Sequence, residues 1–510
     1  MAERHDAIVI GSGIGGLTAA AFLAKGGVRP LVLEKHFLPG GNAMTFRRKK
    51  MFDFDVGFHY IGNCGPGGLF PTILEQLGVA DRVEFVPLNP DDFDTVHLPD
   101  LVFHTPVGWE RYRQRLQEAF PQETRAIDRY IDFMMTAAGR APAPGQRPLQ
   151  ELLGKPASRC TLAEVFDALE TSQPLRHLLG AIYATYAVPP SKAPAVTHAT
   201  VVDHYMGGAY FVRGGGQPIV EALLSVIKDG GGEVRLRSKV ERIIVEGEKA
   251  VGVELASGEE LRAPIVLSNA DAKRTFLEMV GEEHLSPAFA QRINGYRMAL
   301  PLFIIYMAME VDPSELGLPS TNIALIPAYD IEEQFAACYE GRLPDRPAVF
   351  IPIASLKDPL SENIAPRGYT NLQLMSVAPA QPQAWGVSQG PASAPTRSGY
   401  RHTPAYVAAK REMEERMLRV VEEMMPGFIR KVVWQESASP RTQERFTLSS
   451  GGTSYGLEHT LDQAMAARVP YQTEVPGLWM VGANTPFGHG YVGCMMGGRT
   501  VATMILQQSR

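Results

Sequence analysis

Three glycines near the amino terminus have the spacing that holds a phosphate-bearing ligand. Gly11, Gly13 and Gly16 form the pattern Gly-x-Gly-x-x-Gly. The first glycine of such a pattern makes a tight turn, the second lets backbone approach a pyrophosphate, and the third lets a helix pack closely on a strand. Glu34 follows at the spacing of an acid that accepts hydrogen bonds from ribose hydroxyls and repels a 2′-phosphate. The pattern predicts a dinucleotide site, and further predicted contacts are Ser12, Ile14, Gly15 and Lys35.

The elements expected around these residues agree with the pattern. Residues 7–10 form an uncharged apolar run, typical of a strand buried on both faces of a parallel sheet. Residues 14–25 are predicted to form a helix whose N-terminus presents free N–H groups to an anion. A second apolar run, 31–33, leads to Glu34. A glycine-rich turn in an ordinary α/β domain is the alternative, and the agreement of strands, helix and acid disfavours it.

A glycine pair just past the acid separates FAD from NAD. Glu34, five further residues and then Gly40-Gly41 resemble the double-glycine motif of the large FAD oxidoreductase superfamily that includes glutathione reductase, amine oxidases and phytoene desaturases. The resemblance implies a second backbone approach to the pyrophosphate of FAD, with Asn42 beside it. Asn42 stands where that motif usually has a basic residue. A plain β-turn glycine pair is the alternative interpretation.

Two further stretches resemble the retinol saturases and their phytoene desaturase and carotenoid isomerase relatives. The first is Phe-Asp-Phe-Asp-Val-Gly-Phe-His-Tyr-Ile-Gly at 52–62, which in those families borders the isoalloxazine ring. The second, within 449–460, is Tyr-Gly-Leu-Glu-His-Thr. By the same resemblance the backbone of Val240 contacts adenine, and His59, Asn269 and Ala270 lie near the cofactor.

The carboxy-terminal stretch 477–493 is predicted to close the FAD site. A short apolar strand leads into a glycine-rich loop and then into a helix that begins near Val492. A helix N-terminus aimed at the flavin stabilises the anion that forms on reduction. The predicted contacts from this stretch are Gly482, Ala483, Gly490, Tyr491 and Val492.

These motifs predict an α/β fold: a Rossmann-type FAD-binding domain of the glutathione-reductase-like superfamily with an inserted α+β substrate domain. A chain of 510 residues is too long for a single hydrophobic core. We expect a discontinuous FAD-binding domain (1–108, 206–290 and 441–510) and a substrate domain (109–205 and 291–440). Two stretches rich in proline and glycine, 141–156 and 381–404, are predicted loops.

Five polar residues in the motifs are candidates for proton exchange: His59, Tyr60, Tyr455, His459 and His489. We select His59, Tyr60 and His489 as catalytic candidates, because the segments of His59 and His489 are those expected to border the ring. A hydrogen bond to flavin or backbone is the alternative role for each. The flavin carries the redox chemistry by hydride exchange at N5, and the protein holds the substrate in position against it. In a conjugated chain the developing charge spreads over the polyene, so a strong base is not required.

Bulk composition disfavours several classes of protein. Lys and Arg number 49 against 55 Asp and Glu, and the net charge of −6 argues against a nucleic-acid partner. The four cysteines are widely separated, so neither a metal site nor a redox disulfide is predicted, and they fit a reducing compartment. Neither a leader peptide nor an apolar run of membrane-spanning length is recognised. We expect a cytoplasmic protein; peripheral membrane contact is a hypothesis motivated only by the expected substrate, and the oligomeric state stays open.

The function predicted from these observations is FAD-dependent oxidation, reduction or isomerisation of C–C or C=C bonds in a long hydrophobic polyene or isoprenoid. No dedicated NAD(P)H-binding domain is predicted, so the redox partner is oxygen, a quinone or a diffusing reductant, or none if the reaction is an isomerisation. A flavin amine oxidase is one alternative, and it needs an aromatic cage that only the segments of Tyr455 and Tyr491 offer. A non-catalytic lipid-binding escort protein, similar to the GDP-dissociation inhibitors, is the other.

Overall fold

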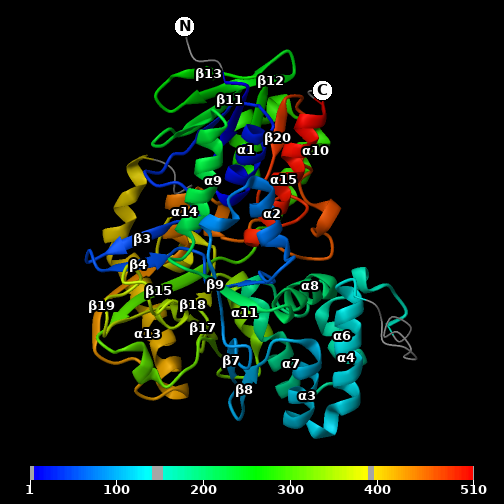
Figure 1. The fold of residues 1–510 in the computed structure, drawn as a ribbon, viewed down its shortest axis with the longest axis vertical. Coiled ribbons are helices and arrows are strands. Elements are labelled where there is room, and N and C mark those ends of the chain that lie inside the picture. The colour runs from blue at the N-terminus through cyan, green and yellow to red at the C-terminus, as the bar shows by residue number, and fades with distance from the viewer. Residues whose placement is uncertain (1–4, 141–152, 389–394, 509–510) are drawn as a thin grey trace.

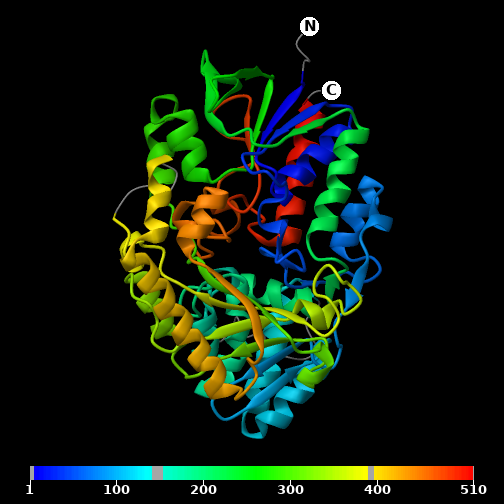
Figure 2. The ribbon, with the colours of Figure 1, turned by 90° about the vertical axis from the view of Figure 1, so that its left-hand side faces the viewer.

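Two lobes, each built on its own large sheet, make up this computed structural model, which describes residues 5–140, 153–388 and 395–508. The lobe drawn at the top of Figure 1 carries both ends of the described chain, and the other lobe lies below it. The turned view in Figure 2 separates the lobes and shows segments that run between them. The chain passes from one lobe to the other several times, so each lobe is discontinuous in sequence.

The first lobe contains a five-stranded parallel sheet. In spatial order its strands are β10 (Glu233–Arg235), β2 (Pro30–Leu33), β1 (Ala7–Ile10), β14 (Ile265–Ser268) and β20 (Leu478–Met480). Strand β1 is fully buried, as the uncharged run at 7–10 predicts for a strand covered on both faces. The register pairs Ile10 with both Leu33 and Ser268, so the residues that follow three strands meet at one edge.

Two helices, α1 (Ile14–Lys25) and α9 (Gln217–Asp229), pack on this sheet, and a third, α15 (Gly490–Gln508), packs on α1. The predicted helix at 14–25 is confirmed, and Gly26 caps it. The carboxy-terminal helix begins at Gly490, two residues before the predicted Val492, and lies beside α1 (Figure 2). The antiparallel strands β11 (Val240–Glu246), β12 (Lys249–Leu255) and β13 (Glu260–Arg262) form a separate small sheet. Helix α10 (Pro287–Gly295) and the π-helix Arg274–Val280 complete this lobe.

The second lobe is built on a mixed seven-stranded sheet. Its strands, in spatial order, are β19 (Val432–Ala438), β15 (Leu302–Met309), β18 (Thr370–Val377), β17 (Val349–Pro352), β16 (Asn322–Leu325), β7 (Asp94–His97) and β8 (Val102–Thr105). One prediction needs correction here, because β7 and β8 fall within 1–108, the segment assigned to the FAD-binding domain. Parallel pairing of β7 with β16 puts them in the other sheet, so that boundary lies before Asp94. The rest of the predicted division stays a prediction.

Helices surround this second sheet and form a cluster beside it (Figure 1). They are α3 (Trp109–Ala119), α4 (Thr124–Ala137), α6 (Leu162–Ala168), α7 (Gln173–Gly180), α8 (Ala195–Met206), α11 (Ile331–Tyr339), α12 (Ala354–Lys357) and α13 (Pro404–Met424). Of the predicted loops, 141–152 and 389–394 lie outside the described residues. Elsewhere in 381–404, Trp385 is fully buried and stacks on Phe303 with ring centroids 5.6 Å apart, which anchors that part of the loop.

Short elements connect the lobes. Strands β3 (Thr45–Arg48) and β4 (Phe52–Asp55) form a hairpin, and β5 (Ile61–Gly62), β9 (Ala209–Val212) and β6 (Phe85–Pro87) form a three-stranded sheet. Helices α2 (Leu69–Leu77) and α14 (Pro440–Thr447) lie between these elements and the first lobe. Among the described residues, no helix combines the length and apolar character that crossing a bilayer requires.

We expect the close packing of α15 on α1 to tolerate no added atom at Gly498. A Cβ there would lie 2.6 Å from the Gly15 carbonyl oxygen and 2.9 Å from the Ala19 amide nitrogen. Gly498→Ala should therefore lower the free energy of unfolding by about 1–3 kcal/mol in urea denaturation. Gly295→Ala, at the end of α10 where an added Cβ meets nothing within 4 Å, is the matched control and should change it by no more than ~1 kcal/mol. Equal effects of the two substitutions would contradict the packing argument.

Candidate active site

One cavity of about 2000 Å³ extends from the glycine loop of the first lobe to the sheet of the second lobe. Small-molecule sites usually measure about 300–1,000 Å³, so this cavity has room for a dinucleotide together with a second molecule. Near the first lobe its wall is mainly glycine-rich backbone. Near the second lobe the wall is mainly apolar, and its members include Leu178, Ile182, Leu302, Ala324, Phe350 and Met375.

The glycine loop leaves bare backbone facing this cavity. A Cβ at Gly13 would lie 2.7 Å from the side-chain nitrogen of Asn269, and one at Gly16 would lie 2.5 Å from the Gly11 carbonyl oxygen. Gly41, in the left-handed region at φ +59°, sits with its Cβ position 3.1 Å from the Gly13 Cα atom. Side chains are thus excluded from a concave surface formed by both glycine motifs. Such a cradle fits a pyrophosphate, which takes hydrogen bonds from backbone amides.

The acid Glu34 ties these two motifs together. Its carboxylate accepts hydrogen bonds from the Ser12 amide at 2.9 Å, the Ser12 hydroxyl at 2.6 Å and the His36 amide at 2.7 Å. The Gly40 amide donates in turn to the Ser12 hydroxyl at 3.1 Å. Glu34 is buried and lines the cavity, and an ionised carboxylate has about four acceptor positions, so about one position remains for a ribose hydroxyl.

Of the predicted cofactor contacts, Gly16 alone does not line the cavity, since its role is the close approach of α1 to the strand. The others all do, from Gly11 through Val492. Whether each touches the cofactor stays a prediction. Asn42, which replaces a basic residue, accepts a hydrogen bond from Gln443 at 2.6 Å.

Cations that the motifs do not reveal line the same region. Arg274 of the π-helix, Arg445 and Lys239 lie on the cavity wall with Lys35. Burial and these neighbouring cations lower the pKa of Lys35 to about 8, partly offset by Glu34. Lys35 donates to the Arg445 carbonyl oxygen at 2.9 Å. Positive charge is therefore available near the predicted anion site although Asn42 carries none. No sequence motif marks Arg274 or Arg445, because each comes from a separate segment.

A buried arginine organises the closing loop. Arg468 is 1% exposed, and its guanidinium donates to four backbone carbonyls, those of Thr485 (3.1 Å), Gln463 (3.2 Å), Leu457 (3.1 Å) and Ala483 (2.6 Å). Burial lowers its pKa to about 10, so the group stays charged near neutral pH. The planar fork of arginine suits several acceptors at once. Sequence reasoning missed Arg468, because a lone arginine in an irregular segment has no recognisable pattern.

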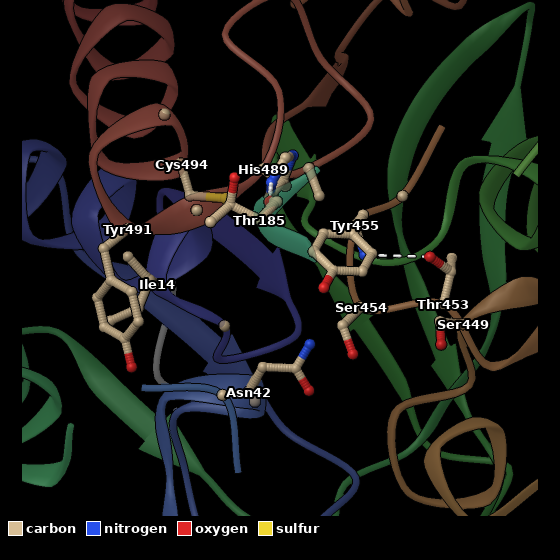
Figure 3. A pocket seen from close by; sticks show the side chains of 18 of the residues that line it. Ile14, Asn42, Thr185, Ser449, Thr453, Ser454, Tyr455, His489, Tyr491 and Cys494 are labelled. Atoms are coloured by element: carbon tan, nitrogen blue, oxygen red, sulfur yellow. Dashed lines mark hydrogen bonds between the residues drawn. The ribbon is translucent and has the colours of Figure 1, made fainter. Parts of the chain in front are cut away.

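The N-terminus of α15 points into the cavity through Gly490, Tyr491 and Val492. Figure 3 shows Tyr491 and Tyr455 on opposite sides of the cavity, with Asn42 on the wall between them. Tyr491 packs edge-on against Phe58 at 5.0 Å, and its buried hydroxyl has no hydrogen-bond partner among the described residues. Buried hydroxyls normally have a partner. A bound ligand in the cavity would supply one.

His489 uses both ring nitrogens in hydrogen bonds within the protein. Nε2 lies 2.6 Å from the Thr185 carbonyl oxygen, which only accepts, so Nε2 carries the hydrogen. Nδ1 then accepts from Nε2 of His459 at 2.7 Å. Burial lowers the pKa of His489 to about 4, which makes the ring neutral at physiological pH. This geometry favours the alternative role for His489, a hydrogen bond to backbone, over proton exchange with a substrate.

His59 and Tyr60 lie at the other side of the cavity, toward the second lobe. Burial, with a smaller effect of Lys357, lowers the pKa of His59 to about 3, and its ring makes no hydrogen bond to the described residues. The Tyr60 hydroxyl donates to a carboxylate oxygen of Asp94 at 2.9 Å, and its ring stacks on Tyr205 at 4.4 Å. All three catalytic candidates line the cavity, and the roles of His59 and Tyr60 in catalysis stay predictions.

The parallel sheet, glycine cradle, buried acid and helix N-terminus at one cavity define the class of FAD-binding oxidoreductases. A family model described as flavin containing amine oxidoreductase matches residues 14–340. The chain belongs to this family, and FAD is its cofactor. The residues at the cavity fit the group: glycines and a helix N-terminus for the pyrophosphate and flavin, and Glu34 for the ribose.

Three comparisons extend this assignment. The human "All-trans-retinol 13,14-reductase" is 30% identical and is matched over 99% of this chain and 86% of its own length. The carrot (Daucus carota) "Prolycopene isomerase, chloroplastic" is 26% identical, over 99% of this chain and 81% of that protein. An oxidoreductase from Methanosarcina mazei has a similar fold, with a TM-score of 0.67 and 19% identity over 98% and 99% of the two chains.

We expect Arg468→Met to reduce FAD retention, because four carbonyls of the closing loop lose their common donor. The flavin-to-protein absorbance ratio of the purified variant should fall severalfold. Arg419→Met on α13, whose side chain is exposed and away from the cavity, is the control and should bind FAD as the parent does. Full flavin content in a folded Arg468→Met protein would show that the loop holds its shape without this cation.

Proposed function

We propose that the protein is an FAD-dependent oxidoreductase that acts on the C=C or C–C bonds of a long hydrophobic polyene, by saturation, desaturation or isomerisation. The observation that carries this proposal is the apolar extension of the cofactor cavity into the second lobe. Two relatives named for retinol and prolycopene support the same substrate class. FAD, when bound, supplies hydride exchange at its N5 atom.

The chain's own residues contribute binding and water exclusion. Leu302, Ile304 and Met375 come from the central strands of the second sheet, and Phe350 adds an aromatic face beside them. Helix α7 and the segment after it contribute Leu178, Leu179 and Ile182. Burial of apolar surface stabilises a bound molecule by about 25 cal/mol per Å², so a long hydrocarbon chain gains affinity along the whole apolar part of the cavity, which we call the tunnel. A small charged amine would gain little from these walls.

A substrate panel tests the proposal. The purified holoenzyme is reduced with dithionite under anaerobic conditions and mixed with all-trans-retinol, a carotenoid or a fatty acyl ester. The oxidised holoenzyme is mixed separately with amines. We expect only the polyenes to be consumed, with flavin reoxidation if the bond is reduced and with none if it is isomerised. Reduction of the oxidised flavin by amines alone would support the amine oxidase alternative. A colourless purified protein that binds lipid would support the escort alternative.

Peripheral membrane contact is part of the proposal on a narrower basis. Met465 and Phe487 line the cavity, yet their side chains are 65% and 44% exposed, and Leu461 nearby in sequence is 38% exposed. An apolar substrate leaving a bilayer would meet apolar residues there. The predicted cytoplasmic location stays a prediction.

We expect the protein to sediment with phosphatidylcholine liposomes more than its Met465→Ser/Phe487→Ser variant does. Phe446→Ser is the matched control, because Phe446 also lines the cavity, is 41% exposed, and comes from a different segment that packs against His36. Equal sedimentation of parent, variant and control would argue against membrane contact at this rim.

A further inference from the structure

A buried lysine lies behind the tunnel wall, outside every motif recognised in the sequence. Lys357, the last residue of α12, is 1% exposed. Its ammonium group donates to the His59 carbonyl oxygen at 2.8 Å and to the side-chain oxygen of Asn322. An ionised group in such a position is costly unless compensating charge is close. The residues around it supply that charge.

A line of hydrogen bonds leads from Lys357 to the cavity. The Asn322 amide donates to one oxygen of Asp94 at 2.7 Å, since the parallel register of β16 and β7 sets these two residues side by side. The other oxygen of Asp94 accepts from the Tyr60 hydroxyl at 2.9 Å. Asp94 and Tyr60 both line the cavity. A tyrosine hydroxyl at the tunnel is thus backed by a carboxyl group and, beyond an amide, by a lysine.

The charges around Lys357 do not balance if every group is ionised. Asp55, the second buried carboxyl group near Lys357, accepts a hydrogen bond from the Gly216 amide at 2.8 Å. One cation then faces two carboxyl groups, and the neutral arrangement keeps one of them protonated. Burial raises the pKa of Asp94 and of Asp55 to about 7 each, and burial lowers the pKa of Lys357 to about 7. Interacting groups of this kind titrate together, so the cluster holds a proton that becomes exchangeable near neutral pH.

Other ionisable groups near the cluster have different roles. His59 is neutral and contacts the lysine only through its backbone oxygen. Asp92 raises the pKa of Asp94, but its carboxylate accepts hydrogen bonds from Thr95 and His104 and not from the residues of the cluster. Asp53, near Asp55, pairs with Arg47. The Tyr205 ring stacks on Tyr60 and restricts it.

We propose that Tyr60 exchanges a proton with the substrate, that Asp94 exchanges it in turn with Tyr60, and that Lys357 is the positioning residue that sets the charge of Asp94. The enzyme then adds or removes hydrogen instead of isomerising a bond. This inference rests on the proposed function and narrows it to one type of reaction. In the saturating direction, one carbon of C=C gains a hydride from the reduced cofactor, and the π pair forms the second C–H bond with the Tyr60 proton. Tyr60 regains a proton from Asp94 and Asp94 from solvent. Reduced FAD, when bound, would supply the hydride with its two electrons, and dithionite would supply the two electrons for the next turnover.

The first test measures single-turnover saturation of all-trans-retinol by the dithionite-reduced holoenzyme across pH. Tyr60→Phe keeps the stacked ring and should slow hydrogen addition by about 10²–10⁴-fold. The parent rate should fall as pH rises through the pKa of Asp94, because the proton-donating form is lost. Lys357→Met removes a cation that lowers the pKa of Asp94, so the fall should move to higher pH. Tyr369→Phe, a tyrosine outside the cavity with no side-chain hydrogen bond among the described residues, is the control and should stay within about twofold.

The second test does not depend on turnover. Infrared difference spectra of the holoenzyme should show a protonated carboxyl band that titrates near neutral pH. The band should be lost in Asp94→Asn and should titrate at higher pH in Lys357→Met. A band unchanged in Asp94→Asn would overturn the assignment of the stored proton.

The outcomes separate this inference from the proposed function. If the parent protein consumes no polyene, the proposed function fails. If the parent isomerises polyenes with no gain or loss of hydrogen, or saturates them with Tyr60→Phe as fast as the parent, the proposed function stands and the proton-exchange inference is overturned.

Discussion

Close approach of bare backbone at one edge of the parallel sheet is the constraint on which the rest of the structure depends. The strands that precede Gly11, Glu34 and Asn269 end in register, so the chain after each must turn within a few ångströms of the others. Two close approaches leave room only for glycine: at Gly16 in α1 a Cβ would meet a carbonyl oxygen at 2.5 Å, and at Gly498 in α15 one would meet the backbone of α1. The same crowding that excludes side chains exposes the amides that a pyrophosphate needs.

Two buried cations stabilise other parts of the cavity wall: Arg468 the closing loop, and Lys357 the region of Asn322 and the His59 backbone. Among the described residues Arg468 pairs with no carboxylate; it donates to backbone carbonyls and so shapes the closing loop. Lys357 also donates to oxygens of neutral groups, while the buried carboxyl groups of Asp94 and Asp55, one of them protonated, compensate its charge. Removing one partner of such an arrangement leaves an uncompensated charge, which costs more than the pairing gains. The positions of the loops and side chains around the cavity, and the electrostatic field within it, therefore depend on a few buried charges.

The parts of the site whose residues lie close together in the sequence could be predicted, and the parts that combine distant segments could not. The cofactor end consists of residues within local strand–turn–helix units, so Gly11 to Gly16, Glu34 and the 482–492 loop were recognisable from spacing. The boundary at residue 108 was wrong because β7 pairs with β16, more than two hundred residues away, and no local pattern records a long-range parallel pairing. His489 looked available from its motif, and only its two hydrogen-bond partners revealed that both nitrogens are engaged.

The sequence by itself determined the class of fold and its cofactor, because dinucleotide binding uses short-range patterns whose geometry is set by backbone sterics. Tertiary structure alone decided which polar groups face the tunnel and which charges they share. Tyr60, Asp94, Asn322 and Lys357 come from four separate segments. Their contact depends on how the second sheet is assembled, and burial shifts the pKa values of Tyr60, Asp94 and Lys357 only once that sheet has formed.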